Sequence, residues 1–184
     1  MIVGIAVGSA FTYNGIGHAN ATGTQVRAVR SPCNLAPPGL VGRLLPHAAI
    51  SSEDRYLNPG EKGFAQASCS FQEVGEATHL DLDVRRSGPK IVYKSKGKKE
   101  TEPAAQIAQE DFERSVTGLR QKCSMSPVKA GEQAFACRAG DTDAVKYLVL
   151  ARKADLVVTI SEEPAIPGQE DLFRQIALAV LGSA

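Results

Sequence analysis

The stretch AVKYLVLARKADLVVTIS, residues 144–161, decides the fold more than any other part of the chain. It consists of two apolar runs, AVKYLVLAR and DLVVTIS, on either side of a turn at residues 153–155 (Lys-Ala-Asp). Both runs are apolar on both faces of an extended strand for several residues, which is typical of buried strands. We therefore expect a hairpin of two central strands that are covered by helices.

Shorter runs on either side of this hairpin also have strand character. THLDLDVRR, residues 78–86, alternates apolar with charged side chains, so this strand is expected to have one buried and one wet face. Residues 64–71 and 131–139 are further strand candidates, and residues 91–93 extend or follow the alternating strand. Short strands joined by tight turns favour an antiparallel sheet.

Apolar residues at three- and four-residue steps predict three helices, at about residues 38–45, 102–122 and 168–182. Pro38 and Pro103 stand where a first-turn proline belongs, since that turn has no use for the missing N–H. Residues 47–63 are rich in Ser, Asn, Pro and Gly and are expected to form a loop. The predicted fold is α+β, with a mainly antiparallel sheet of about five or six strands and helices packed on one face.

Length and charge fit one ordinary domain. The chain has 184 residues, of which 21 are basic and 20 acidic, giving a formal net charge of +1. This balance argues against a nucleic-acid partner, because such proteins neutralise phosphates with an excess of Lys and Arg. We expect a leader or clipped membrane anchor at 1–21, a linker at 22–31, and a single disulfide-braced domain at 32–184.

The first 21 residues indicate the compartment in which the protein is expected. Ile2 to Phe11 are apolar or small, which is too short for a spanning helix but long enough for the core of a secretory leader. Residues 19–21 (Ala-Asn-Ala) fit the small-x-small cleavage pattern. No Lys or Arg precedes the run, so either the true start lies upstream, with part of an anchor missing, or the run is an N-terminal strand. Export is favoured, and the protein is expected outside the cell or at its surface.

The four cysteines, Cys33, Cys69, Cys123 and Cys137, form an even set without Cys-x-x-Cys spacing, and no His is placed to complete a zinc site. In an exported protein they predict two disulfides. Three pairings exist, and we favour Cys33–Cys69 with Cys123–Cys137, because each pair then ties a helix end or its entry to the following strand. The alternative is four reduced, buried cysteines in a cytosolic protein.

Several stretches resemble a family of actinobacterial exported envelope lipoproteins that carry a domain of unknown function. The likeness covers about residues 31–182 and rests on these stretches: SPCNLAPPGLVGRLL, Cys69-Ser70-Phe71, GEQAFACRAG, YLVLARKADLVVTI and DLFRQIALAVL. The resemblance implies an exported, non-enzymatic domain and supplies neither a ligand nor catalytic residues.

The chain departs from that family's pattern in three places. No lipoprotein cysteine follows the leader, and the second cysteine pair is not a general feature of the family. The hairpin turn reads Lys-Ala-Asp at 153–155 rather than Gly-Asn. The first departure leaves a lipid anchor of the lipoprotein type without a residue to carry it.

Residues suited to catalysis or to metal binding are few. His18, His47 and His79 are the only histidines, and no motif supplies any of them with a catalytic partner. Asp81 and Asp83 are two apart on one face of a strand, as paired catalytic carboxylates or cation ligands would be. Alternation alone also places them there, so a solvated face is the favoured interpretation. No nucleotide or cofactor motif is present, and we expect neither cofactor nor metal.

The most concentrated charge is the lysine cluster in KSKGKK, made up of Lys94, Lys96, Lys98 and Lys99. Such a cluster can contact anionic lipid head groups or wall polymers. Glu100 and Glu102 follow at once and offset the charge, so a solvated hairpin tip is the favoured interpretation.

These features favour a non-catalytic extracytoplasmic domain that binds a partner protein or an envelope component. A second hypothesis is a carrier of a lipid or metabolite, which requires a large apolar cavity between sheet and helices. A third is a cell-wall hydrolase, which requires a nucleophile, a base and an orienting acid in one pocket.

Overall fold

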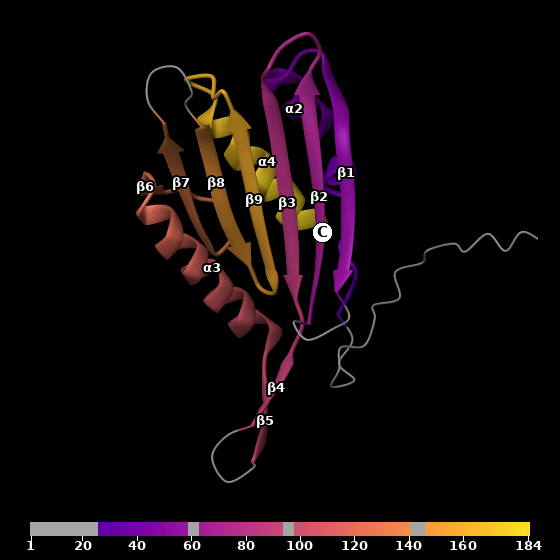
Figure 1. Ribbon diagram of the computed structural model, residues 1–184, viewed down its shortest axis with the longest axis vertical. Coiled ribbons are helices and arrows are strands. Elements are labelled where there is room, and N and C mark those ends of the chain that lie inside the picture. The colour runs from indigo at the N-terminus through magenta and orange to yellow at the C-terminus, as the bar shows by residue number, and fades with distance from the viewer. Residues whose placement is uncertain (1–25, 59–62, 94–97, 141–145) are drawn as a thin grey trace, which may run out of the picture.

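The structure is a computed structural model that describes residues 26–58, 63–93, 98–140 and 146–184 (Figure 1). The predicted leader at 1–21 and residues 22–25 of the predicted linker lie outside these ranges. In chain order the described elements are α1 (Pro32–Leu35), α2 (Pro38–Leu44), β1 (Ala48–Asn58), β2 (Phe64–Glu73), β3 (His79–Ser87), β4 (Lys90–Tyr93), β5 (Lys99–Glu102), α3 (Ala104–Arg120), β6 (Ser124–Pro127), β7 (Gln133–Ala139), β8 (Lys146–Lys153), β9 (Leu156–Glu163) and α4 (Glu170–Ser183).

An antiparallel sheet of seven described strands, in the order β1-β2-β3-β9-β8-β7-β6, forms the body of the domain. The expected hairpin at 144–161 is β8–β9, and it lies in the middle of the sheet as predicted. Lys153 pairs with Leu156, and Ala154 takes a positive φ of 50° in the tight turn. β9 also pairs with β3, so strands far apart in the sequence lie side by side at the centre.

The sheet has more strands than the five or six predicted, because its edge strands carry no apolar pattern. β1 occupies much of the stretch 47–63 that we expected to be a loop, and that expectation is wrong for residues 48–58. β1 pairs with β2 along its length, with Ser51 as the extra residue of a bulge. As an edge strand whose described side chains are mostly exposed, β1 gives no alternation to detect. β6, at the other edge, has only four residues.

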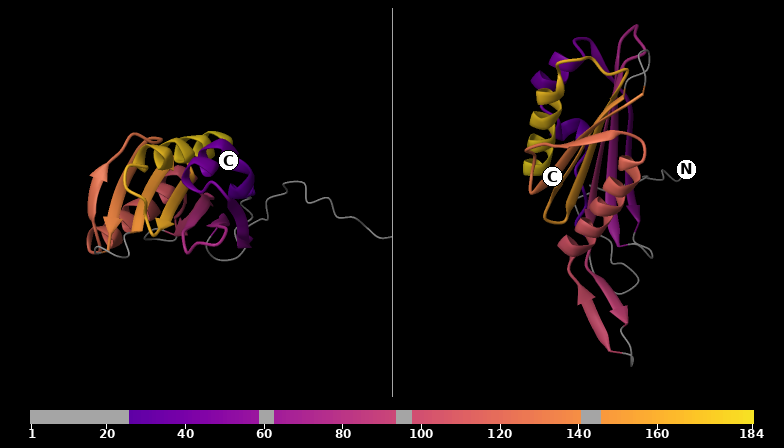
Figure 2. Two further views of the ribbon diagram at one scale, coloured as in Figure 1. Left: turned by 90° about the horizontal axis from the view of Figure 1, so that it is seen from above. Right: turned by 90° about the vertical axis from the view of Figure 1, so that its left-hand side faces the viewer.

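Helices cover both faces of the sheet, whereas the sequence predicted helices on one face only. α1, α2 and α4 lie on one side, and α3 lies on the other (Figure 2). The reason is the hairpin itself, which is apolar on both faces. Leu150 and Val157 pack against α3, while Val158 and Ile160 pack on the side of α4, so both apolar faces are removed from water. The coarser prediction, an α+β domain with an antiparallel sheet, is confirmed.

The larger core lies between the sheet and α1, α2 and α4. Bulky side chains that are almost completely buried there come from α2, β3, β8, β9 and α4: Leu44, Leu80, Leu82, Val84, Val149, Val158, Ile160, Phe173, Ile176 and Val180. β2 adds the small side chains of Ala65, Ala67 and Cys69. The smaller core lies under α3 and is built around Phe112, with Ala108, Val116, Leu150 and Val157. The alternation predicted for residues 78–86 therefore holds, since Leu80, Leu82 and Val84 face the larger core.

The predicted linker at 22–31 contributes to this core at its second half. Val26 and Val29 are buried in the larger cluster, and the Arg86 guanidinium donates a hydrogen bond to the Ala28 carbonyl at 3.1 Å. Gly88 allows the close approach, because a Cβ at this position would lie 2.4 Å from a Val26 methyl group. The folded domain therefore begins no later than Val26, and residues 26–31 do not form a linker.

β4 and β5 form a separate two-stranded hairpin that projects from one end of the main sheet (Figures 1 and 2). We call this hairpin, residues 90–93 and 98–102, the β4–β5 arm. Lys90 pairs with Glu102 and Tyr93 with Lys99, so opposite charges and a cation–aromatic pair meet across the two strands.

Candidate functional site

One part of the sheet surface has no helix over it among the described residues. It is the outer face of β1 and β2 and the adjoining parts of β3 and β9, on the side away from α4, and Figure 1 looks onto it. Because side chains alternate along a strand, the neighbours of the buried Leu80, Leu82 and Val84 must point to this face. Asp81 and Asp83 therefore belong to it, and they are half-buried rather than fully solvated.

Two matching rows of oxygen-bearing side chains cross this face. The strand register places Ser68, Asp83 and Thr159 side by side on β2, β3 and β9. The second row, two residues further along each strand, is Ser70, Asp81 and Ser161. Each row thus has a carboxylate between two hydroxyls. From sheet geometry the rows are about 7 Å apart and each spans about 10 Å.

The two rows line a shallow recess of about 220 Å³. Its floor is completed by Cys69 and Leu82, whose side chains point to the opposite face and are buried in the core. We call this recess the β3 groove and define it by the six side chains Ser68, Ser70, Asp81, Asp83, Thr159 and Ser161.

Hydrogen bonds hold both carboxylates of the β3 groove in place. The Ser70 hydroxyl donates to Asp81 Oδ1 at 2.6 Å, and the Gln66 amide donates to Asp83 Oδ2 at 2.5 Å. Burial raises the pKa of the Asp83 carboxyl, and the Gln66 hydrogen bond and the positive charge of Arg85 oppose this rise. The carboxylate oxygens are therefore oriented before any ligand arrives.

Three hydroxyls of the β3 groove have no hydrogen-bond partner within the described part of the chain: those of Ser68, Thr159 and Ser161. Ser161 is the most informative of them, because its residue is only 7% exposed. Its hydroxyl oxygen is not fully enclosed and opens into the recess. Ser161 lines the recess, so a group placed in the β3 groove can supply the missing partner.

α3 forms a wall at one end of this face. Arg85 Nη2 lies 2.9 Å from Asp111 Oδ2 on α3, and the Arg85 guanidinium stacks over the Phe64 ring at 4.1 Å from its centroid. The carboxylate of Asp111 and the ring of Phe64 both interact favourably with the positive charge of Arg85. The arginine next to the β3 groove is therefore a structural link between β3 and α3, and its charge acts on the Asp83 carboxylate only through space.

A serine, an aspartate and a histidine come together at the other end of the β3 groove, but not in the order of a catalytic triad. In a triad the imidazole lies between nucleophile and acid, so that it can take the proton of the nucleophile. Here Asp81 lies in the middle, bonded to Ser70 and with Oδ2 3.5 Å from His79 Nε2. His79 Nδ1 is 3.4 Å from the Ala77 carbonyl oxygen. Ser70 therefore has a carboxylate, and no imidazole, as its neighbour.

The remaining residues that the sequence indicated lie elsewhere. His18 is outside the described residues, and His47 is exposed at the start of β1, where its backbone N–H donates to the Glu73 carboxylate. Within the described ranges no group of three or more His, Cys, Asp or Glu side chains is placed to hold a metal ion. The side-chain hydrogen-bond donor to Asp81 is therefore the Ser70 hydroxyl, and the donor to Asp83 is the Gln66 amide. Neither aspartate belongs to a described group of three possible metal ligands.

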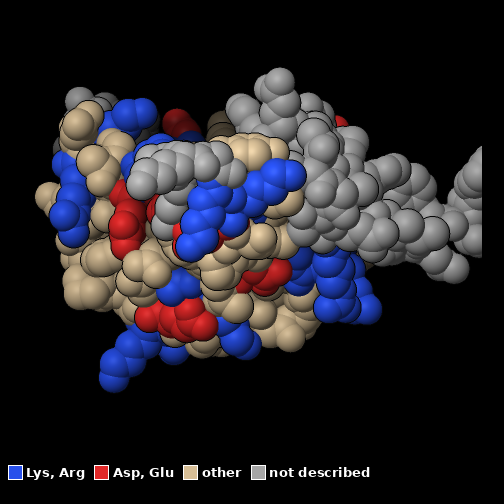
Figure 3. Space-filling model, turned by 90° about the horizontal axis from the view of Figure 1, so that it is seen from below, with Lys and Arg blue, Asp and Glu red and all other residues tan. Residues whose placement is uncertain are grey.

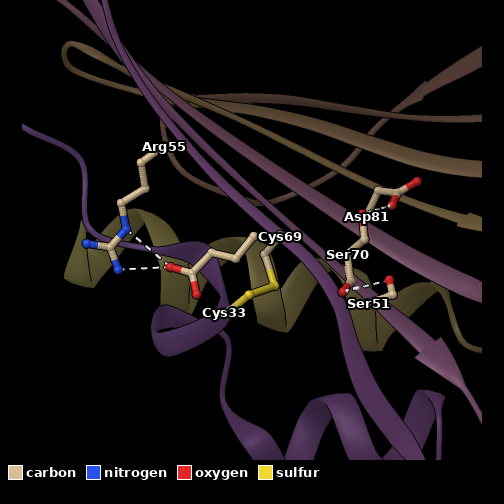
Figure 4. Close-up of a disulfide and its surroundings, with 7 residues drawn as sticks. Cys33, Ser51, Arg55, Cys69, Ser70 and Asp81 are labelled. Atoms are coloured by element: carbon tan, nitrogen blue, oxygen red, sulfur yellow. Dashed lines mark hydrogen bonds and ion pairs between the residues drawn. A yellow bond between two sulfur atoms is a disulfide. The ribbon is translucent and has the colours of Figure 1, made fainter.

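The cysteines form two disulfides, Cys33–Cys69 and Cys123–Cys137, which is the pairing favoured from the sequence. The first ties α1 to β2 on the side of the larger core (Figure 4). In the same view Ser70, the next residue of β2, lies against Asp81. The second disulfide joins the chain after α3 to β7. Among the described residues, no helix is long and apolar enough to cross a bilayer.

The structure describes only part of the lysine cluster. Lys94 and Lys96 fall outside the described residues, whereas Lys98 and Lys99 are exposed. Figure 3 looks at the end of the molecule from which the arm projects, and there basic and acidic side chains are interspersed. The described lysines therefore do not continue into a wide surface of one charge.

The sequence indicated one strand of the β3 groove and missed the other two. Asp81 and Asp83 were identified as a pair on one face, but Ser68, Ser70, Thr159 and Ser161 were not. Their signal is a pair of small hydroxyl residues two apart, at 68 and 70 and again at 159 and 161. That signal has meaning only once β3 is known to lie between β2 and β9, and alternation within one strand does not give this order.

Comparison with known proteins does not assign a function to the β3 groove. The chain matches no protein-family model and no curated protein. A function for the domain therefore rests on its own residues, above all on those of the β3 groove.

Proposed function

We propose that the chain is a non-catalytic extracytoplasmic domain that binds a partner protein or a cell-envelope component through the β3 groove. One observation carries the proposal: a recess on the uncovered part of the sheet is lined by Ser161, a residue only 7% exposed, whose hydroxyl faces the recess without a described partner. A group bound in the recess can satisfy this hydroxyl in place of water.

Two disulfides support the extracytoplasmic part of the proposal, because structural disulfides form and persist mainly in oxidising compartments. We propose accordingly that the protein acts outside the cell or at its surface. The resemblance to actinobacterial exported envelope proteins points the same way, and kinship with that family is part of the proposal.

The order of groups around Ser70 supports a role in binding over one in hydrolysis. A serine nucleophile needs an adjacent base that takes its proton, and an imidazole does this efficiently near neutral pH. The Ser70 hydroxyl instead donates to Asp81, which leaves it oriented as an acceptor toward the recess. We infer that Ser70 and Asp81 position hydrogen-bonding groups for a ligand.

Packing favours this groove over the internal cavity that a lipid or metabolite carrier needs. The space between the sheet and α1, α2 and α4 is occupied by one continuous cluster of buried side chains. Leu82, Ile160 and Ile176 are almost completely buried within it. A carrier would have to displace these contacts, whereas the β3 groove is already open to solvent.

Site-specific photo-cross-linking in the native cells tests the proposal. A photoreactive residue is placed at Ser68, in the β3 groove, and in a matched variant at Leu178, which is exposed on α4. We expect adducts with an envelope component or an exported protein from position 68 and none from position 178. Equal adduct formation at the two positions, or none at position 68, would contradict the proposal.

A further inference from the structure

We infer that the β3 groove binds a neutral, hydroxyl-rich ligand, namely the saccharide units of a glycan. The inference rests on the proposed function and narrows it to one chemical class of envelope ligand. Three properties of the groove carry it: the kind of groups in the two rows, the groups that are left without a partner, and the charge around them.

The rows suit hydroxyl ligands because they offer both donors and acceptors. A carboxylate only accepts hydrogen bonds, whereas a serine or threonine hydroxyl donates one and accepts others. Each row places a carboxylate between two such hydroxyls, as in Ser68, Asp83 and Thr159. Sugar hydroxyls also donate and accept, so neighbouring hydroxyls of one ring can bond to a carboxylate and to the hydroxyl beside it.

The groups without a partner are neutral, which favours a neutral ligand over a cation. The carboxylate of Asp81 is already engaged by Ser70 and that of Asp83 by Gln66. The hydroxyls of Ser68, Thr159 and Ser161 have no described partner. Within the described residues no third carboxylate joins the two aspartates, so a cation would lack the six to eight oxygen ligands that Ca²⁺ takes.

Charge excludes the opposite class, an anionic ligand. The guanidinium that flanks the recess on β3, that of Arg85, is paired with Asp111 and stacked on Phe64. A phosphate or uronate in the β3 groove would lie beside two carboxylates without a free guanidinium from Arg85 to offset the repulsion.

The rows also provide a rigid and extended platform. All six side chains project from paired strands, which hold positions more precisely than loops do. β1 prolongs the rows, because Asp54 pairs with Ser68 and Ser52 pairs with Ser70. A linear glycan of several units can therefore continue from the recess across the exposed edge of the sheet.

Isotope-labelled, disulfide-bonded protein titrated with neutral oligosaccharides of glucose, galactose, mannose and arabinose, and followed by NMR, tests the inference. We expect at least one of them to shift the backbone signals of Ser70, Asp81 and Thr159 in a saturable way. The same glycan carried as a glycolipid head group in vesicles gives a second arm, which shows whether the natural source is a free polymer or a membrane lipid. Ca²⁺ alone and an oligouronate are the contrasting probes.

Matched variants show whether the hydroxyls bind the glycan. Thr159→Val removes one groove hydroxyl at nearly constant shape, and Thr117→Val removes an exposed hydroxyl on α3 that does not line the recess. We expect Thr159→Val to weaken binding about 5- to 10-fold, the effect of one lost hydrogen bond, and Thr117→Val to leave it unchanged. Equal affinities of the two variants would overturn the inference.

Other outcomes overturn it in distinguishable ways. If an exported protein or another non-glycan envelope fraction shifts the groove signals while every neutral oligosaccharide fails, the glycan inference is wrong and the proposed function stands. If Ca²⁺ or the oligouronate shifts them and the neutral sugars do not, the ligand class is wrong. If no envelope fraction shifts them either, the inference and the proposed function fail together.

Discussion

The two faces of β3 differ in chemistry although they alternate residue by residue. On one face Leu80, Leu82 and Val84 are buried in the larger core, and on the other Asp81 and Asp83 line the β3 groove. The first face removes apolar surface from water and stabilises the fold. The second holds polar groups, and we expect them to contribute less to stability. Alternate residues of the same strand thus serve stability on one face and, in our proposal, binding on the other. Substitutions on the core face should therefore lower stability, and substitutions on the groove face should weaken binding.

The largest expected effect comes from the disulfide on the core face. Replacing Cys33 and Cys69 by Ala opens a link between residues 36 apart, and replacing Cys123 and Cys137 opens one between residues 14 apart. Loop-closure entropy predicts losses in unfolding free energy of about 4 and about 3 kcal/mol respectively. Denaturant unfolding of the two double variants checks the order, and a larger loss for the shorter link would contradict it.

A single truncation on the core face should come next. Leu82→Ala removes a side chain that is almost completely buried, and we expect a loss of about 3 kcal/mol in unfolding free energy, within the usual range for such cavities. Asp81→Asn, the adjacent residue on the other face, is the matched control and should change stability by less than about 1 kcal/mol. Comparable losses for the two variants would mean that the faces do not differ in this way.

A buried carboxyl on the core face should respond to pH. Glu162 is completely buried, with Oε2 accepting from the Ile166 N–H at 3.1 Å and Oε1 without a partner among the described residues. Burial raises its pKa, and the hydrogen bond from Ile166 opposes the rise. Because the folded pKa exceeds the unfolded one, the favourable contribution is complete below the unfolded pKa and is lost as pH rises through the folded pKa.

The substitution Glu162→Gln should therefore stabilise the protein more at pH 8 than at pH 4, since Gln carries no charge to bury. Unfolding measured at both pH values checks this sign, with Glu76→Gln, in an exposed turn, as the control variant. A variant that loses more stability at pH 8 than at pH 4 would show that the charged form of Glu162 is favoured in the fold.

The smallest effect on stability is expected on the β4–β5 arm. Lys98 and Lys99 are exposed, so replacing both by Ala should change the unfolding free energy by less than about 0.5 kcal/mol. If the lysine cluster contacts anionic surfaces, the same variant should bind vesicles of anionic lipid more weakly, by about 1 kcal/mol for each lysine. Co-sedimentation with vesicles measures this, and Lys129→Ala, an exposed lysine in the segment after β6, is the control. If the variant sediments with the vesicles as the unaltered protein does, Lys98 and Lys99 do not contribute to binding of anionic surfaces.

The sequence predicted the parts of the fold that carry strong patterns. The helices near 38–45, 102–122 and 168–182, the alternating strand at 78–86 and the apolar hairpin at 144–161 all have a period that burial imposes. β1 escaped detection because an exposed edge strand needs no apolar period. The second helix layer was missed as well, although a hairpin that is apolar on both faces requires cover on both.

The candidate site was less predictable than the fold. The alternation at 78–86 placed Asp81 and Asp83 on one face, but their hydroxyl neighbours come from β2 and from β9, which lies about 75 residues away along the chain. Antiparallel pairing can join many strands in several orders, and local periodicity does not choose among them. The rows of the β3 groove therefore became visible only with the strand order of the sheet.

Ser161→Ala tests the division between the two faces most directly, because the same variant is measured for stability and for binding. The substitution deletes a hydroxyl that has no described partner, so we predict an unfolding free energy that is unchanged or higher. We also predict weaker binding of the neutral oligosaccharide that shifts the groove signals most. A variant that loses stability while it keeps full affinity would show that Ser161 serves the fold, and it would contradict the assignment of this face to binding.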